Sequence, residues 1–225
     1  MRITDLLNHL SEGILNYRKD APVLVGIDGV DAAGKTTLAD RLANKLEESQ
    51  RQIIRASIDG FHNSRAIRYR QGRNSPIGYY QDSFDHRRII DRLLGPLSSG
   101  HLQYQEAAFD YRIDKEVILP FKKADKDAIL VMDGIFLFRP ELLEFWDIKI
   151  FLEVGFDVTL QRAIRRAKEQ GSQDSEQEII DIYNLRYIPG QRLYFHEASP
   201  VEKADILIDN SDYENPSIIR TVFRP

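Results

Sequence analysis

Two glycines five residues apart, followed by a lysine and a threonine, form the most informative pattern in this chain. Residues 29–36 read GVDAAGKT and match G-x-x-x-x-G-K-[ST]. Glycines allow successive backbone N–H groups to point at one anion, and the helix that follows adds its positive N-terminal end. Lys35 would reach the β- and γ-phosphates of a nucleotide, and the Thr36 hydroxyl would ligate Mg²⁺. The pattern therefore predicts a phosphate-binding loop.

The alternative interpretation of this stretch is a plain glycine turn with a lysine on the surface. An apolar run before the loop and an amphipathic segment after it favour the nucleotide site. A guanine-nucleotide switch would also need Asn-Lys-x-Asp after a later strand, whereas Asn44-Lys45 lies inside the helix after the loop. The residues expected to bind ATP are Gly29, Val30, Asp31, Ala32, Ala33, Gly34, Lys35, Thr36 and Thr37.

Two aspartates end apolar runs that read as strands of the same sheet. Asp59 closes the run 52–59, and Asp133 lies at the end of the run 126–134. Ligands bind at the carboxyl ends of strands in open α/β sheets, so both side chains would face the terminal phosphate. Asp59 suits the base that orients or deprotonates a hydroxyl, and Asp133 suits Mg²⁺, directly or through water. The expected metal ligands are Thr36, Asp133 and Asp59; the alternative is that both aspartates are turn residues.

Three arginines share a helical stretch farther along the chain. Arg162 lies three and four residues before Arg165 and Arg166, so it shares a helix face with them. A lid that closes over ATP and its acceptor would use such arginines to neutralise developing charge. Arg162 and Arg165 are therefore predicted to be catalytic together with Lys35 and Asp59. The alternative is a solvated basic face.

A second basic cluster follows Asp59 closely. It consists of Arg65, Arg68, Arg70 and Arg73. An acceptor that already carries phosphate would suit this cluster. A solvated loop or helix face is the favoured interpretation.

Strand-length apolar runs alternate with helical patterns. The runs lie at 23–28, 52–59, 126–134, 147–154 and 204–210, and they are apolar on both faces, as parallel strands covered by helices should be. Helical spacing marks the N-terminus and the segments 83–94, 140–145, 158–169 and 175–186. The alternation predicts a doubly wound α/β sheet. Residues 102–120 lack a helical period and predict a β-hairpin or irregular flap.

Composition excludes several classes of protein. The chain has 225 residues, a net charge of −4 and no cysteine, which rules out disulfides and thiolate metal sites. The N-terminal segment is too polar for a signal peptide, and no segment approaches the roughly 18 apolar residues of a membrane span. The mildly acidic balance argues against general nucleic-acid binding. We expect a cytoplasmic protein with neither nucleic-acid nor membrane partners; a homo-oligomer stays open.

Four stretches together resemble the uridine kinase-like branch of the P-loop kinases, which includes phosphoribulokinase and bacterial pantothenate kinase. They read GVDAAGKTTLADRLA, SIDGFHNS, YYQDSFDHRRIIDRLLGPLSSG and MDGIFLFRPELLEFWDIKIFLEVGFDVTLQRAIRRA, and PVEKADILIDNSDYENP is similar to the family's last strand and adenine-side loop. The resemblance implies a P-loop NTPase fold of three layers, α/β/α, with a five-stranded parallel sheet in the order 2-3-1-4-5. It also implies ATP with Mg²⁺ as donor, Asp59 as base and lid arginines within 162–166. We expect one kinase domain over residues 1–225, with a flap at about 102–120 and a helical lid at about 160–190.

The acceptor side departs from the family pattern. His62 stands where uridine kinases often have another aromatic residue, and Asp85 matches the acidic residue that holds ribose hydroxyls. The flap reads Phe-Asp-Tyr, ending at Tyr111, and Asp114 takes the place of a histidine that meets the pyrimidine. The candidate substrate-binding residues are His62, Asp85, Tyr111, Arg166 and Tyr187. Tyr187, with Gln191 and Tyr194, either lines the acceptor pocket or packs the lid helices onto the sheet.

These observations favour an ATP-dependent kinase that transfers the γ-phosphate to a hydroxyl of a small molecule, with a nucleoside as the favoured acceptor. Pantothenate, a sugar or a sugar phosphate is the alternative acceptor. An ATP-binding regulatory or adapter protein is the alternative of another class. The set of Lys35, Asp59, Asp133 and the lid arginines speaks against it, because a pure binder needs no base.

Overall fold

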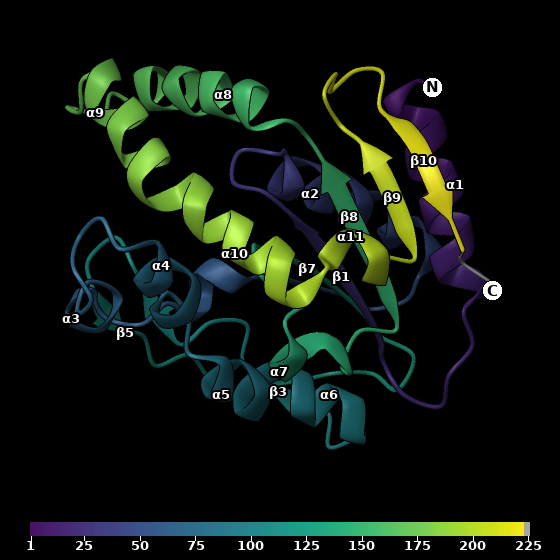
Figure 1. Cartoon of the computed structure of the whole chain (residues 1–225). Coiled ribbons are helices and arrows are strands. Elements are labelled where there is room, and N and C mark those ends of the chain that lie inside the picture. Colours follow the sequence, from purple (N-terminus) through teal and green to yellow (C-terminus); the bar gives the residue numbers. More distant parts are fainter. Residues whose placement is uncertain (223–225) are drawn as a thin grey trace.

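A six-stranded sheet forms the centre of the computed structural model, which describes residues 1–222 (Figure 1). The last residues of the expected domain, 223–225, lie outside the described residues. In spatial order the strands are β2 (Ile53–Ser57), β7 (Ile129–Asp133), β1 (Val23–Gly29), β8 (Ile148–Glu153), β9 (Ile206–Asp209) and β10 (Ser217–Thr221). The first five run parallel, which confirms the predicted order 2-3-1-4-5. Strand β10 pairs antiparallel with β9 and was not anticipated from the sequence.

The parallel register aligns the ends of three strands. Asp133 at the end of β7 lies beside Ile27 of β1 and Ser57 of β2. The chain therefore leaves β1 and β2 at the same edge at which β7 ends. Residues that directly follow these strands must meet there, which is the condition for a ligand site in an open parallel sheet.

Helices cover both faces of the sheet, which confirms the predicted three layers. On one face lie α1 (Ile3–Asn16) and α2 (Lys35–Leu46). The other face and the sheet edge carry α3 (Arg65–Arg68), α4 (Pro76–Asp82), α5 (His86–Ile89), α6 (Gly95–Ser99), α7 (Pro140–Leu143), α10 (Ile188–Ala198) and α11 (Pro200–Lys203). The predicted lid contains α8 (Phe156–Glu169) and α9 (Glu176–Ile182), which lie at the top left of Figure 1 and lead into α10. A 3₁₀ turn, η1 (Glu47–Ser49), follows α2, and another, η2 (Ile58–Phe61), follows β2.

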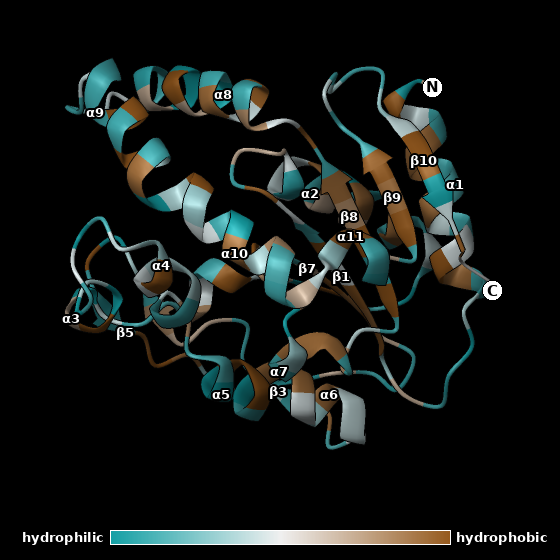
Figure 2. Cartoon of the chain, in the orientation of Figure 1, coloured by the Kyte–Doolittle hydropathy of each residue, from teal (hydrophilic) through white to brown (hydrophobic). Residues whose placement is uncertain are grey.

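The central strands β1, β7 and β8 are largely apolar on both faces, and much of their length is brown in Figure 2. Successive side chains of β1 alternate between the layers: Leu24 packs in the cluster under α6 and α10, and Val25 packs against α1 and α2. Gly26 comes next, and a Cβ there would lie 2.8 Å from the indole of Trp146. The indole thus packs directly on the β1 backbone.

Three expected helices begin or end elsewhere than the periodicity predicted. The first starts at His86, capped by Asp85, and continues through a π-helical turn, η3 (Ile90–Leu94), into α6. The second starts two residues early, at Phe156. The third runs from α9 through another π-helical turn, η4 (Tyr183–Tyr187), into α10, so it passes Pro189 without a break. A π-helical turn before Pro189 tolerates the missing backbone N–H, because the hydrogen-bond pattern is already shifted there.

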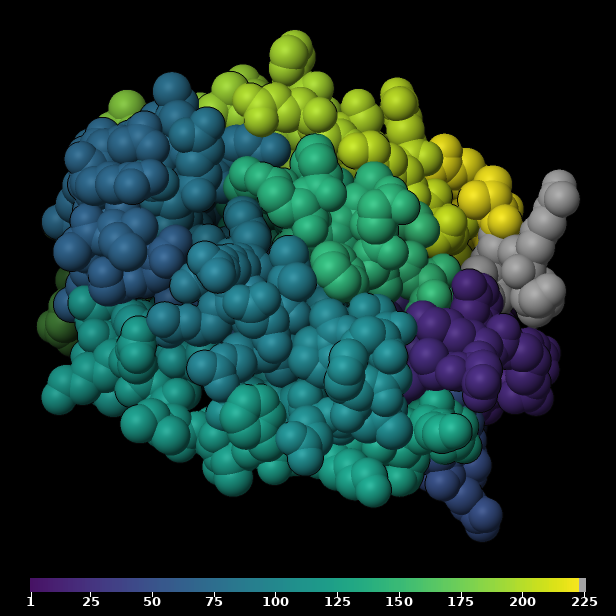
Figure 3. All heavy atoms as spheres, turned by 90° about the horizontal axis from the view of Figure 1, so that it is seen from below, coloured from purple at the N-terminus to yellow at the C-terminus, as the bar shows by residue number. Residues whose placement is uncertain are grey.

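The predicted flap is a pair of short antiparallel ladders. Strand β4 (Phe109–Asp110) pairs with β5 (Lys115–Glu116), and β3 (Gln103–Tyr104) pairs with β6 (Lys122–Lys123). Seen from below, this segment and α5–α6 form much of the surface, coloured teal in Figure 3. None of the helices within residues 1–222 is long and apolar enough to cross a bilayer.

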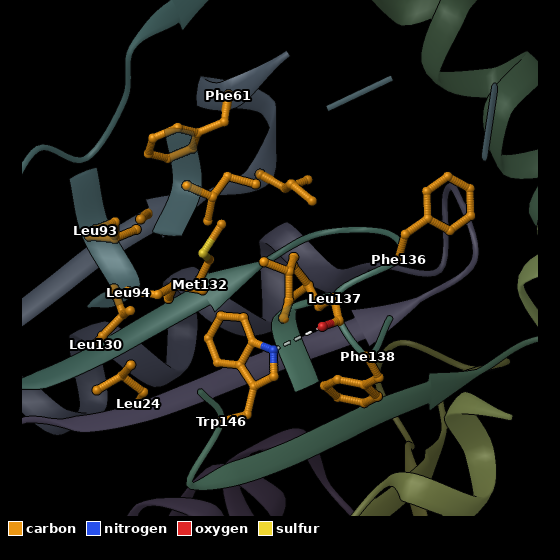
Figure 4. Packing of buried hydrophobic residues seen from close by; sticks show 14 of the residues in the cluster. Leu24, Phe61, Leu93, Leu94, Leu130, Met132, Phe136, Leu137, Phe138 and Trp146 are labelled. Atoms are coloured by element: carbon orange, nitrogen blue, oxygen red, sulfur yellow. Dashed lines mark hydrogen bonds between the residues drawn. The ribbon is translucent and has the colours of Figure 1, made fainter. Parts of the chain in front are cut away.

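The packing of Trp146 predicts a large effect on stability. Its side chain is 4% exposed, and its Nε1–H donates to the Leu137 carbonyl oxygen at 2.9 Å (Figure 4). Trp146→Ala should lower the free energy of unfolding by about 3–5 kcal/mol, because it leaves a cavity and an unpaired carbonyl. Urea denaturation followed by circular dichroism measures this. The control Ile118→Ala, at a side chain 97% exposed, should change stability by at most about 0.5 kcal/mol. Equal stability of the two variants would contradict this packing.

Candidate functional site

The predicted phosphate loop joins β1 to α2 at the aligned edge of the sheet. Gly34 takes a left-handed φ of 95° as α2 begins, and a Cβ at Gly34 would lie 2.7 Å from the Asn210 amide nitrogen. That amide donates to the carbonyl oxygen of Ala33 at 2.7 Å. Lys35 is 8% exposed, and its Nζ donates to the carbonyl oxygen of Val30 at 2.7 Å. The ammonium is therefore held inside the curve of the loop.

A buried aspartate supports the start of this loop and was missed by the sequence analysis. Asp28 is fully buried; its carboxylate accepts from the backbone N–H of Gly29 at 2.6 Å and of Phe138 at 3.1 Å, and from the Tyr194 hydroxyl. Burial raises the pKa of Asp28 to about 6, although these donors and Lys35 oppose the shift. The only signal in the sequence was a charge inside an otherwise apolar strand.

Asp133 and Thr36 meet as predicted. The Thr36 hydroxyl donates to Oδ2 of Asp133 at 2.7 Å. Oδ1 of Asp133 lies 2.7 Å from a guanidinium nitrogen of Arg55, which also pairs with Asp40 at 2.8 Å. Arg55 was not expected here; it stands on β2 two residues before the strand's end, and only the register with β7 brings it to Asp133.

Asp59 lies in the 3₁₀ turn that follows β2, on the same side of the molecule as Lys35. Its side chain is 56% exposed at the open edge. Partial desolvation and the neighbouring charge of Asp133 raise the pKa of Asp59 to about 6, while the charge of Lys35 opposes the shift. The structure thus brings Lys35, Asp133 and Asp59 into electrostatic range of one another.

These residues fit Mg²⁺, although they do not form a complete cage. Oxygen donors from Thr36 and Asp133 suit this hard cation. Oδ1 of Asp133 is enclosed and makes no aligned hydrogen bond with any described residue, so it keeps a lone pair for a further ligand. Within residues 1–222, no group of three or more His, Cys, Asp or Glu side chains is arranged to hold a metal ion. Mg²⁺ would therefore take its remaining ligands from phosphate and water, as it commonly does.

Among the predicted lid arginines, Arg166 faces the phosphate loop. Its guanidinium lies 3.4 Å from the Asp31 carboxylate, which also accepts from the Tyr183 hydroxyl. The Asp31 backbone N–H donates to Gln191 at 2.6 Å. Burial raises the pKa of Asp31, but Arg166, Lys35 and Tyr183 outweigh it and leave the pKa below its ordinary value. Asp31 therefore ties the lid to the loop.

Arg162 reaches the carbonyl oxygen of Ala33 in the phosphate loop at 3.5 Å but bonds mainly to the β9–β10 connection, and Arg165 is exposed. The Arg162 guanidinium donates to the carbonyl oxygens of Asn210 at 2.8 Å and Ser211 at 2.9 Å, and it stacks 3.6 Å from the centroid of the Tyr213 ring. Arg165 is 63% exposed and lies 3.7 Å from Glu169. Neither side chain contacts Asp59 or the loop's ammonium, so their catalytic role stays a prediction that requires the lid to move.

Two of the predicted acceptor residues, His62 and Tyr111, lie together beside Asp59. The centroid of the His62 ring lies 4.5 Å from that of Phe84 and 4.9 Å from that of Tyr111. Nδ1 of His62 is 3.9 Å from the Asp59 carboxylate. Burial lowers the pKa of His62 to about 4, so the ring is neutral at pH 7. These rings form one wall next to the expected base.

The remaining candidates have structural contacts of their own. Asp85 caps α5 by accepting from the Arg88 N–H at 2.9 Å. Tyr187 packs against Tyr79, with ring centroids 4.7 Å apart. Tyr187, Gln191 and Tyr194 were expected either to line the acceptor pocket or to pack the lid helices onto the sheet. Tyr194 has a packing role, because its side chain is buried in the core. Gln191 instead holds the phosphate loop.

Residues 24–211 match the family model described as the phosphoribulokinase / uridine kinase family. The chain belongs to this family. A uridine kinase of Clostridium botulinum is 26% identical over 199 residues, which cover 88% of this chain and 92% of the relative. The family accounts for the ATP-binding loop of this kinase fold and supports a phosphotransferase.

Solved structures share the fold of this family member. A possible uridine kinase from Bacillus stearothermophilus has a TM-score of 0.73 and 24% identity, covering 92% of this chain and 99% of its own. A D-glycerate 3-kinase from Cryptococcus neoformans has a TM-score of 0.63 and 10% identity, covering 95% and 99%. At these identities the likeness concerns the fold alone.

The buried carboxyl of Asp28 predicts a pH-dependent stability. Because its pKa is about 6 in the folded protein and about 4 in the unfolded chain, the folded protein binds more protons between pH 4 and 6. The free energy of unfolding should therefore fall by about 2–3 kcal/mol as the pH rises through this window, because the buried carboxyl of Asp28 loses its proton. Asp28→Asn removes the titrating group, so the wild type should lose this stability relative to the variant between pH 4 and pH 7. Denaturation curves at each pH measure the difference.

Asp20→Asn is the matched control, at an exposed aspartate before β1. Its stability should run parallel to the wild type across the same range. A constant difference between wild type and Asp28→Asn at every pH would contradict the assignment.

Proposed function

We propose that this protein is an ATP-dependent kinase that transfers the γ-phosphate to a hydroxyl of a small molecule. The observation that carries the proposal is the convergence of Lys35, Thr36, Asp133 and Asp59 at one edge of the parallel sheet. Phosphoryl transfer depends mostly on positioning and on neutralising charge, and these groups supply both. Membership of a kinase family agrees with this chemistry.

Asp59 is the proposed base. It accepts the hydroxyl proton while the hydroxyl oxygen bonds to the γ-phosphorus, and the bond from that phosphorus to the β–γ bridging oxygen breaks to release ADP. A pKa of about 6 leaves Asp59 ionised at pH 7 and brings it closer to the value at which a base is most effective. Its exposed position at the open edge gives an acceptor access to it.

The phosphates would be held by the loop N–H groups, by Lys35 and, after lid movement, by Arg166. Thr36 and Asp133 would hold Mg²⁺, which when bound neutralises charge on the phosphate oxygens. Arg166 now pairs with Asp31. Phosphate oxygens, like a carboxylate, accept charge-assisted hydrogen bonds from a guanidinium, so ATP would compete with Asp31 for Arg166.

The base of ATP would lie near Arg162. This side chain lines an open hollow of about 650 Å³ along α8, together with Val158, Gln161 and Arg165. The Asn210 amide ties the adjoining β9–β10 connection to the phosphate loop. The similarity of this connection to the family's adenine-side loop supports the placement.

A nucleoside is the favoured acceptor, as the name of the Clostridium botulinum relative suggests. Asp85 would then hold ribose hydroxyls beside the wall of His62 and Tyr111. A second candidate keeps the reaction and changes the acceptor to pantothenate, a sugar or a sugar phosphate. Asp114 favours this candidate, because it replaces the histidine that meets the pyrimidine in uridine kinases.

Removal of the Asp59 carboxylate tests the proposal. Asp59→Asn should leave ATP affinity unchanged, since Lys35 and the loop are intact. ADP release with an active acceptor should fall at least about 100-fold, the usual contribution of a general base. Isothermal titration measures the first quantity and a coupled ADP assay the second. Asp20→Asn serves as the control, and undiminished transfer by Asp59→Asn would remove Asp59 from the base role.

The pH dependence of the same reaction is a separate prediction. Because Asp59 must be ionised to accept a proton, kcat/KM should fall about tenfold for each pH unit below about 6. Steady-state rates between pH 5 and 8 give the profile. A rate that is independent of pH across this range would show that no group with this pKa acts in the reaction.

A further inference from the structure

One arginine of the cluster that follows Asp59 differs from the other three. Arg65, Arg70 and Arg73 are exposed, as a solvated loop would require. Arg70 pairs with the buried carboxylate of Asp82, so its charge is already matched. The Arg68 side chain, in contrast, is only 11% exposed. The interpretation of this cluster as a solvated face therefore holds for the other three arginines but not for Arg68.

The charge of Arg68 is incompletely matched. Its guanidinium makes one long contact, 3.5 Å to the Asp114 carboxylate, and lies 5.6 Å from the centroid of the Tyr69 ring. Its Nε is enclosed and has no hydrogen-bond partner in the described part of the chain. A guanidinium offers five donors in a planar fork, and leaving a buried one unpaired costs free energy. An anion would satisfy it.

Arg68 lies beside the proposed acceptor wall. Its charge is close enough to lower the pKa of His62, whose Nδ1 is 3.9 Å from the Asp59 carboxylate, and it also acts on Tyr187. The loop that carries α3 and the β4–β5 hairpin lie side by side in Figures 1 and 3, and the Asp114 carboxylate accepts from the Arg65 N–H at 2.8 Å. The Arg68 guanidinium therefore lies where α3, the flap and the loop of Asp59 come together.

The loop that carries Arg68 is fixed in place. Arg186 is 2% exposed, and its guanidinium donates to the carbonyl oxygens of Arg68 at 3.1 Å and of Arg73 at 2.9 Å. The nitrogen that bonds to Arg73 also reaches the carbonyl oxygens of Gly72 at 3.4 Å and Ser75 at 3.2 Å. A fork on a fixed loop is prepared for a ligand, since less conformational freedom is lost on binding.

We propose that Arg68 binds an anionic group, a carboxylate or a phosphate, on the acceptor whose hydroxyl faces Asp59. This inference rests on the proposed kinase function and narrows its acceptor from any alcohol to one that carries a negative charge. Asp114 occupies the fork when the acceptor is absent. The selectivity depends on Arg68, the enclosed arginine of this loop, whose Nε has no hydrogen-bond partner among the described residues.

The test compares matched acceptors that differ only in charge. Pantothenate against pantothenyl alcohol and glycerate against glycerol test a carboxylate, ribose 5-phosphate against ribose tests a phosphate, and uridine and cytidine represent neutral nucleosides. Wild type should release ADP with a charged member in preference to its neutral partner. Arg68→Gln should lower kcat/KM for the charged acceptor about 10- to 100-fold, the value of a charge-assisted hydrogen-bond pair, and Arg68→Lys should lose less.

Two further variants separate a binding role from a structural one. Arg73→Gln, at an exposed arginine of the same loop, should behave as wild type. Asp114→Asn keeps the side-chain oxygen that accepts from Arg65 and suits the left-handed φ of 55°, but it removes the competing charge. It should lower KM for the charged acceptor about two- to fivefold relative to KM for the neutral partner of the same pair.

The outcomes distinguish this inference from the proposed function. If wild type phosphorylates a neutral acceptor and Arg68→Gln does so equally well, the inference is overturned and the kinase function stands. If Arg68→Gln lowers turnover of charged and neutral acceptors alike, Arg68 has a structural role and the inference is overturned. If no acceptor of the panel stimulates ADP release by wild type, the proposed function fails on this panel and the inference fails with it.

Discussion

A lysine ammonium enclosed among carboxylates is the interaction on which this site depends. Burial lowers the pKa of Lys35, while the charges of Asp31, Asp28, Asp133 and Asp59 raise it. Each of these acids belongs to a different part of the edge: the phosphate loop, the end of β1, the end of β7 and the turn after β2. Since Asp28 and Asp31 are close in sequence, one cation attracts carboxylates from three distant segments of the chain. Desolvation offsets much of the attraction, so the cluster determines geometry more than it contributes stability.

The arginines around this cluster are engaged with protein groups that resemble their expected ligands. Arg166 contacts the Asp31 carboxylate, Arg162 contacts backbone carbonyls and the Tyr213 ring, and Arg55 contacts Asp133. These contacts balance the positive charges that gather at this edge of the sheet. ATP and its acceptor must therefore displace these protein partners when they bind. The measured affinity then reports the difference in free energy between the new contacts and the protein contacts that they replace.

A local motif and strand periodicity predicted the phosphate loop and the aspartates at the strand ends, and the family resemblance implied the strand order. The sequence could not predict that Arg55 reaches Asp133, since that contact depends on the β2–β7 register. The burial of Asp28 under Tyr194 joins residues 166 apart, which no local period encodes. The difference between Arg68 and its neighbours also arises only when the flap folds against α3. The predicted roles of Arg162 and Arg165 concern a lid position that their present contacts do not reveal.

The central claim is that triphosphate, cation and base converge at the aligned ends of β1, β2 and β7. A crystal structure with Mg²⁺ and a non-hydrolysable ATP analogue tests it most directly. The account predicts the γ-phosphate at Lys35, the metal on Thr36 and Asp133, and the Asp59 carboxylate facing the open side of the γ-phosphate with room for one hydroxyl between them, about 3 Å from each. An Asp59 carboxylate turned away from the γ-phosphate, or a triphosphate bound away from Lys35, would contradict the account.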